Sequence, residues 1–182
     1  MIISGIFAGI AIGIACILYC LAPNPIIGAG LFSLGLLAVR IGQYDLFTGK
    51  IQHWGKTGYD TFAMNAMFWG NAGGIFLTVL LASTCLPQVV ATAGTIGATK
   101  IAVPLLTTFG KAILCGYIMS VATKKDTPLW ISALGVFAFV YSGLNHCIAD
   151  IFYYFMIPSG SFFNHLFITV IGNIIGGRIG GV

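Results

Sequence analysis

The chain has 182 residues, of which 58% are hydrophobic and only 7% are charged, and its mean hydropathy is +1.01. A soluble domain carries about 25% charged residues because its surface must face water. The net charge of +4 is spread too thinly among apolar residues to form a nucleic-acid-binding surface. The composition therefore excludes a soluble enzyme or nucleic-acid-binding domain and predicts an integral membrane protein whose main partner is the lipid bilayer.

Six apolar stretches reach the roughly 20 residues that a helix needs to cross a membrane. They cover residues 2–22, 26–47, 62–86, 95–122, 129–157 and 161–182. A transmembrane β-barrel would instead alternate apolar and polar residues along each strand. The sequence therefore predicts an all-α membrane protein with six transmembrane helices, forming a single domain over residues 1–182.

The distribution of basic residues predicts the orientation in the membrane. Lys50 and Lys56 lie between the second and third spans, Lys124 and Lys125 lie between the fourth and fifth, and Arg178 lies near the C-terminus. Cytoplasmic loops carry an excess of Lys and Arg. We therefore expect a multi-pass protein of the cell (inner or plasma) membrane with both termini in the cytoplasm.

A short pattern recurs in the two halves of the chain. Gly-Asn pairs in the third and sixth spans contain Asn71 and Asn173, 102 residues apart, and polar interruptions fall at residues 46–49 and 143–146. The chain is thus interpreted as two three-helix repeats, about 1–90 and 91–182, with spans two and five interrupted. An odd number of spans per repeat inverts the second copy, and inverted repeats with broken helices are typical of transporters. Chance recurrence of a common Gly-Asn pair is the alternative.

The interruptions also indicate where a substrate would pass. Backbone that leaves a helix at membrane depth is tolerated where protein or a water-filled cavity satisfies its polar groups. Thr48 and His146 fall in the two interruptions, so we expect both beside a substrate path. A packing role is the alternative for His146.

The sequence offers little to support catalysis or cofactor binding. Its five cysteines form no CxxC pair, and the chain contains no Glu. Neither a cluster of metal ligands nor a spacing of nucleophile and base is evident. We therefore predict no enzymatic activity, no cofactor and no metal site.

Several motifs resemble those of the formate/nitrite transporter family, which contains pentameric channels for small monovalent anions. The match includes the Gly-Asn pairs and three segments: YDLFTG at 44–49, ATKIAVP at 98–104, and GLNHCIAD at 143–150 with Pro158 beyond. The last segment is similar to the family motif Gly-Phe-Glu-His-Ser-x-Ala-Asn. The chain is identified as a short, divergent member of this family.

The resemblance implies an aquaporin-like protomer and a homo-pentamer. By motif position it assigns two apolar pore constrictions, one at Leu46 and Phe47 and one at Phe32, Leu36 and Phe139. Ordinary packing is the alternative for these five residues. The resemblance also implies that Lys100 attracts the anion, while His146 and Thr48 hydrogen-bond it at the midpoint and His146 exchanges a proton.

The chain departs from the family pattern near the central His. Asn145 stands where the family has Glu, and Asp150 stands where it has Asn, so acid and amide have exchanged places. Asp150 either lies beside His146 or pairs with Lys100, and we favour the pair with Lys100. Arg40 and Asp45 are a second expected ion pair, because charges in apolar spans are usually paired.

Three functions remain open from the sequence. The first is a channel or transporter for a small monovalent weak-acid anion such as formate, nitrite or hydrosulfide, or its conjugate acid, with proton coupling through His146. The second is a channel for a small neutral solute such as ammonia or urea, which neutralisation of Lys100 would favour. The third is a non-conducting membrane scaffold whose glycines serve packing alone.

Overall fold

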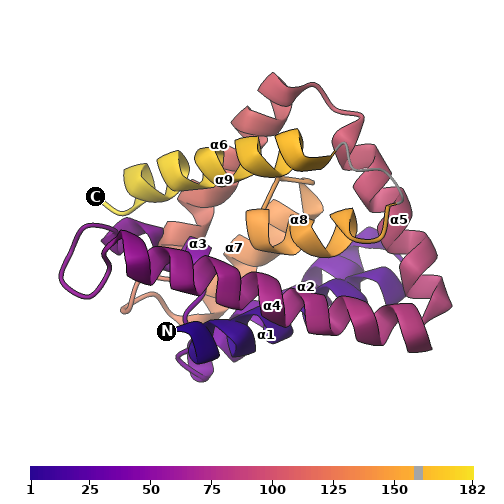
Figure 1. The fold of residues 1–182 in the computed structure, drawn as a ribbon, viewed down its shortest axis with the longest axis horizontal. Helices are drawn as coiled ribbons and strands as arrows, with labels where there is room; N and C mark the ends of the chain where they lie inside the picture. Colours follow the sequence, from indigo (N-terminus) through magenta and orange to yellow (C-terminus); the bar gives the residue numbers. More distant parts are fainter. Residues whose placement is uncertain (158–161) are drawn as a thin grey trace.

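The computed structural model describes residues 1–157 and 162–182, so the motif position Pro158 lies outside the described residues. Within these ranges the chain is mostly helical and has no strand (Figure 1). The elements are α1 (Ile2–Leu21), α2 (Pro25–Ile41), α3 (Phe47–Lys50), the 3₁₀ helix η1 (Ile51–His53), α4 (Thr61–Cys85), α5 (Pro87–Ile101), α6 (Leu105–Ala122), α7 (Leu129–Tyr141), α8 (Cys147–Tyr154) and α9 (Phe163–Gly180). The predicted all-α class is confirmed.

Side-chain caps define where two of the helices begin. The Asn24 side chain accepts a hydrogen bond from the N–H of Ile27 at 3.0 Å, and Asp60 accepts one from Ala63 at 2.8 Å. Pro25 follows Asn24 at the first helical position, where a missing N–H removes no helical hydrogen bond. Local chemistry therefore starts α2 and α4 close to the predicted span boundaries.

The predicted fourth span, 95–122, is wrong as one continuous helix. α5 ends at Ile101 and α6 begins at Leu105. Pro104 has no backbone N–H, and its ring disfavours helical geometry at the preceding residue, so the helix stops there. α5 packs against α8 and carries Lys100 in its last turn.

The longest helices pack in pairs, α1 with α4 and α6 with α9, while α2 contacts α7 (Figure 1). Glycines allow these close approaches. A Cβ on Gly74 of α4 would overlap the backbone of Ile6 in α1, and a Cβ on Gly176 of α9 would overlap that of Ile113 in α6. Small residues therefore set the distance within each helix pair.

Several helices have the length and composition of membrane spans. Among the described residues, α1, α4 and α6 are long and apolar enough to cross a membrane, and α2 and α7 are shorter apolar helices. Large apolar side chains such as Phe62, Leu106 and Trp130 are exposed on the outer surface. This surface suits a lipid environment, and the six-span inverted arrangement stays a prediction.

Candidate functional site

Two helix breaks share one backbone geometry. The chain leaves the helix at residues 42–46, between α2 and α3, and at residues 142–146, between α7 and α8. Each break contains one left-handed residue at the same position, Gln43 with φ 53° and Gly143 with φ 63°. The expected interruptions are therefore present. The first begins earlier than predicted, so Thr48 lies in the first turn of α3 rather than in the break itself.

The Asn71 side chain of α4 stabilises the first break by hydrogen-bonding to its backbone. Its Oδ1 accepts a hydrogen bond from the N–H of Phe47 at 2.8 Å. Its Nδ2 donates to the carbonyl oxygens of Gly5 and Asp45, each at 2.9 Å. One buried amide thus satisfies backbone groups that the broken helix and the neighbouring α1 present to it.

Asn173 of α9 holds the second break in the same way. Its Oδ1 accepts from the N–H of Cys147 at 2.9 Å, and its Nδ2 donates to the carbonyl oxygens of Ala112 at 2.8 Å and Asn145 at 2.9 Å. Gly116 of α6 lies against Asn173, where a Cβ would overlap the Asn173 backbone. The two halves therefore use matching amides to support matching breaks.

Thr48 and His146 meet between these breaks. Thr48 Oγ1 and His146 Nε2 are 2.8 Å apart, and both side chains are buried. His146 Nδ1 accepts a hydrogen bond from the N–H of Ala149 at 3.1 Å and thereby caps α8. Because Nδ1 is an acceptor, the neutral imidazole carries its proton on Nε2 and donates to Thr48. The hydroxyl hydrogen of Thr48 then remains available to donate to another group.

The favoured ion pair between Lys100 and Asp150 is present. Lys100 Nζ lies 3.0 Å from Asp150 Oδ1 and donates to the Leu144 carbonyl oxygen at 3.2 Å. Asn145 Nδ2 donates to the other Asp150 oxygen, Oδ2, at 3.0 Å. The Asp150 side chain is only 2% exposed, whereas that of Lys100 is 15% exposed. The exchanged acid and amide therefore bond to each other, and the ammonium keeps one N–H for a further partner.

A small cavity adjoins this cluster. It has a volume of about 80 Å³ and is lined in part by Lys100, Asp150, His146, Phe32 and Phe139. Phe139 stacks on His146 with ring centroids 5.5 Å apart, and Phe32 meets Phe139 edge-on at 6.1 Å. One water occupies roughly 10–15 Å³ of such space, so the cavity has room for a few waters or one small anion.

A larger cavity of about 640 Å³ adjoins the first break, and we name it the basic vestibule. Leu46 and Gly49 line its inner part, and its described lining residues contain no carboxylate. The basic residues in its wall are Arg40, Lys50, His53 and Lys125. Partial burial, together with neighbouring Lys56 and Lys50, lowers the pKa of His53. The lysines and the arginine therefore supply most of its positive charge at neutral pH.

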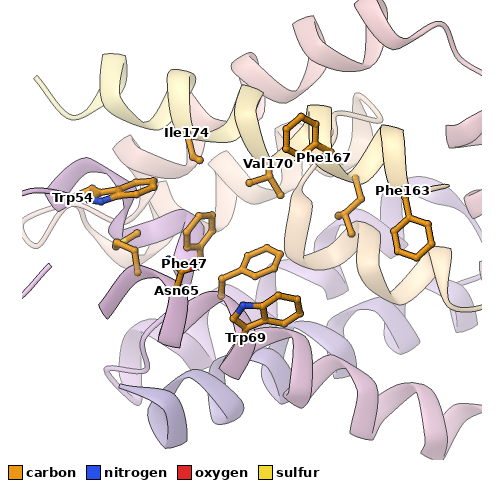
Figure 2. A pocket seen from close by; sticks show the side chains of 11 residues that line it. Phe47, Trp54, Asn65, Trp69, Phe163, Phe167, Val170 and Ile174 are labelled. Atoms are coloured by element: carbon orange, nitrogen blue, oxygen red, sulfur yellow. The ribbon is translucent and has the colours of Figure 1, made fainter. Parts of the chain in front are cut away.

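The five residues assigned to the constrictions do not all line these two cavities. Phe32 and Phe139 line the small cavity, Leu46 lines the basic vestibule, and Leu36 is buried in the apolar core. Phe47 packs edge-on against Phe68 of α4 at 5.3 Å and lines a third cavity, between α4 and α9 (Figure 2). Constriction roles for Leu36 and Phe47 stay predictions.

Arg40 has partners that the sequence did not indicate. The expected pair with Asp45 is wrong, because the guanidinium donates instead to the carbonyl oxygens of Thr127 at 2.6 Å and Lys124 at 3.2 Å, and also to the Ser132 hydroxyl. Carbonyl groups beyond the end of a helix lack helical donors, and a basic side chain satisfies them. Arg40 therefore ties the end of α2 to the segment between α6 and α7.

The polar groups of the site are chiefly hydrogen-bond donors. They are the remaining N–H of Lys100, the hydroxyl of Thr48 and the Nε2–H of His146, which donates to Thr48 in this structure. In the described part of the chain, no group of three or more His, Cys, Asp or Glu residues is placed to hold a metal ion. The arrangement therefore suits a small anion or a small polar neutral molecule.

Comparisons with known proteins give the family. The family model described as formate/nitrite transporter matches residues 1–181. A solved structure described as a pentameric formate channel with formate bound has a TM-score of 0.82 at 24% identity, covering 98% of this chain and 92% of that one. A second, described as an FNT family ion channel, has a TM-score of 0.75 at 22% identity, covering 100% and 85%. No curated protein sequence matches. Since the family model spans nearly the whole chain, the protein belongs to the formate/nitrite transporter family.

Proposed function

We propose that this protein is a membrane channel for small monovalent weak-acid anions such as formate, nitrite or hydrosulfide. Family membership supports transport rather than catalysis. The similar structure described as a formate channel with formate bound supports an anion of this size. The observation that carries the proposal is the buried contact between Thr48 and His146, which lies between the basic vestibule and the small cavity beside Lys100.

The proposed architecture is six membrane spans in two inverted repeats, residues 1–90 and 91–182. The matching breaks at 42–46 and 142–146 support it, as do the matching hydrogen bonds of Asn71 and Asn173. In this arrangement α1 with α4 and α6 with α9 are equivalent pairs. The broken helices α2–α3 and α7–α8 then face each other across the substrate path.

The proposed path runs from the basic vestibule past Leu46 to Thr48 and His146, and then through the small cavity, which is lined by Phe32, Phe139 and Lys100. Positive charge in the vestibule and at Lys100 raises the local concentration of anions. The apolar side chains exclude hydrated ions, because a bare charge pays heavily to enter an apolar passage while its neutral acid pays far less. The solute would therefore cross the apolar segments as the conjugate acid.

The hydrogen bonds of His146 suggest where the proton comes from. A neutral ring that donates its Nε2 proton outright would become an imidazolate, because Nδ1 already accepts from Ala149. We therefore propose that His146 and Thr48 donate hydrogen bonds to the solute, and that the proton comes from the bulk solution and reaches the solute through water in the cavities. Proton transfer through His146 would require the Ala149 hydrogen bond to open first.

Orientation and assembly follow from the same proposal. The basic vestibule contains Lys50 and Lys125, which belong to the basic loops that the sequence assigns to the cytoplasm. We therefore place this vestibule and both termini on the cytoplasmic side of the cell membrane. The pentameric description of the similar structure supports a homo-pentamer with one path through each protomer.

A neutral solute such as urea or ammonia is the second candidate. The observation that favours it is the ion pair between Lys100 and Asp150, which balances the charge at the small cavity. A balanced pair attracts anions less strongly than a free ammonium does.

Solute uptake by proteoliposomes tests the proposal. The purified protein is reconstituted, and uptake of formate, nitrite, hydrosulfide and urea is followed by stopped flow against protein-free liposomes. We expect rapid uptake of the three weak acids, faster at lower pH, and none of urea. Uptake of urea alone would support the second candidate. No uptake of any solute would contradict transport and favour the non-conducting membrane scaffold.

A further inference from the structure

The cavity between α4 and α9 is not part of the proposed path (Figure 2). It has a volume of about 470 Å³, and its wall is apolar and aromatic apart from Asn65 and the indole N–H groups. Trp69, Phe163 and Phe167 line it and are 65%, 66% and 65% exposed. The cavity therefore opens on the outer surface of the chain, which in a membrane protein contacts lipid or another protomer.

The length of the cavity along α9 matches the depth of the hydrocarbon region of one lipid leaflet. Its lining residues on α9 lie along one face from Phe163 to Ile174. At 1.5 Å per residue this stretch is roughly 16 Å long. The hydrocarbon core of a bilayer is roughly 30 Å thick, so one leaflet supplies about half of that depth. An extended acyl chain from a single leaflet fits this length.

One end of the cavity carries positive charge. Arg178 is exposed one helical turn beyond Ile174, and its guanidinium donates to the carbonyl oxygen of Trp54, which lines the cavity. Lys56 is exposed in the same loop as Trp54. The loop carboxylate of Asp60 already accepts the hydrogen bond that caps α4. The two cations, Arg178 and Lys56, outnumber the single carboxylate of Asp60, so this end of the cavity has a net positive charge.

We propose that this cavity binds an acyl chain of an anionic phospholipid, with the headgroup phosphate at Arg178. A guanidinium suits a phosphate, and Trp54 lies at the charged end, as tryptophans do at membrane interfaces. The leaflet is the one on the side of Arg178, where basic residues attract anionic lipids. This lipid site does not depend on which solute the protein transports.

Tryptophan quenching by brominated lipids tests the site. Two single-tryptophan proteins are prepared, one retaining Trp69 (Trp54→Phe, Trp130→Phe) and one retaining Trp130 (Trp54→Phe, Trp69→Phe). Trp130 is 65% exposed on α7, outside the cavity, and serves as the reference. Each is reconstituted in phosphatidylcholine vesicles that contain a small fraction of brominated phosphatidylglycerol or brominated phosphatidylcholine. We expect brominated phosphatidylglycerol to quench Trp69 at least threefold more effectively than brominated phosphatidylcholine, with no such preference at Trp130.

Substitutions in the Trp69 protein separate the headgroup from the acyl chain. Arg178→Gln should abolish the preference for phosphatidylglycerol, and Arg178→Lys should retain most of it. Val170→Phe narrows the cavity and should reduce quenching by both lipids. Ile175→Phe is the matched control, because Ile175 is on the same helix but does not line the cavity.

Three results would overturn the proposal. One is equal quenching of Trp69 by the two lipids. Another is a preference that persists in Arg178→Gln. The third is protection of Trp69 from both lipids, which would mean that a second copy of the chain covers the cavity. The comparison of quenching at Trp69 with quenching at Trp130 tests whether the cavity binds an anionic phospholipid even where a cavity variant fails to fold.

Discussion

Thr48 and His146 are 98 residues apart in the sequence, yet their side chains are hydrogen-bonded at 2.8 Å inside the protein. Thr48 lies on α3, after the first helix break, and His146 caps α8 at the end of the second. The contact therefore joins the two broken helices at one point. The basic vestibule adjoins the first break and the small cavity adjoins the second, so the proposed path includes this contact.

Replacing the Thr48 hydroxyl should impair both stability and transport. Thr48→Val keeps the shape but leaves the Nε2–H of buried His146 without an acceptor, which costs about 1–3 kcal/mol. We expect a lower unfolding temperature. We also expect a formate uptake rate roughly tenfold lower, which corresponds to an activation free energy about 1.4 kcal/mol higher. Thr48→Ser, which keeps the hydroxyl, should retain uptake. Equal uptake by the Val and Ser variants would show that the hydroxyl does not contact the solute.

Asp150→Asn should destabilise the protein because it leaves the ammonium of Lys100 without its counter-charge. Removing one partner of a buried ion pair costs about 3–5 kcal/mol, and the 15% exposure of Lys100 places the expected loss at the lower end. Thermal unfolding of purified protein measures the loss. The double variant Asn145→Glu with Asp150→Asn restores a carboxylate near Lys100 and should recover most of the stability. No recovery would mean that the carboxylate must come from α8.

Gly116→Ala should displace α9 from α6. The added Cβ overlaps the backbone of Asn173, whose amide supports the second break, so we expect a loss of about 1–3 kcal/mol from overpacking. Gly110→Ala on the same helix is the matched control, because a Cβ there meets nothing within 4 Å. Unfolding temperatures of the two variants measure the difference, and similar values would show that α9 adjusts freely.

Phe139→Ala should weaken discrimination by size. The substitution removes the ring that stacks on His146 and meets Phe32, which widens the passage beside the small cavity. We expect acetate uptake to rise relative to formate uptake in proteoliposomes with matched amounts of folded protein. Phe137→Ala is the control, because Phe137 stacks on Tyr141 of the same helix and does not line the small cavity. An unchanged acetate-to-formate ratio in Phe139→Ala would argue against a constriction there.

The ion pair and the breaks could be predicted from residue chemistry. Ionised groups in apolar helices need partners, and Lys100 with Asp150 was the pairing that balanced charge near the central His. The partner of Arg40 could not be predicted in the same way. Its acceptors are mostly backbone carbonyls of the segment after α6, and only the packing of α2 brings that segment near.

The roles of Asn71 and Asn173 required the structure. In the sequence they mark a repeat, but their hydrogen-bond partners lie 24 to 66 residues away and meet them only through the packing of α1 with α4 and α6 with α9. The structure was also needed to show that the Phe47 side chain points toward the cavity between α4 and α9. Its direction depends on where the short α3 begins, because each residue turns a helix by about 100°.

The break between α5 and α6 did have a signal in the sequence. Pro104 disfavours helix at the residue before it, yet the uninterrupted hydropathy of residues 95–122 suggested one span. The break matters for the site, because it lets α5 end with Lys100 beside Asp150.

Comparing nitrite with nitrate tests the central claim most directly. Both are small monovalent oxyanions, but only nitrite is the base of a weak acid. If the solute crosses the apolar segments as its conjugate acid, proteoliposomes should take up nitrite far faster than nitrate, and the difference should grow as the pH falls. Nitrate uptake as fast as nitrite uptake, independent of pH, would contradict the account, because the path would then conduct the bare anion.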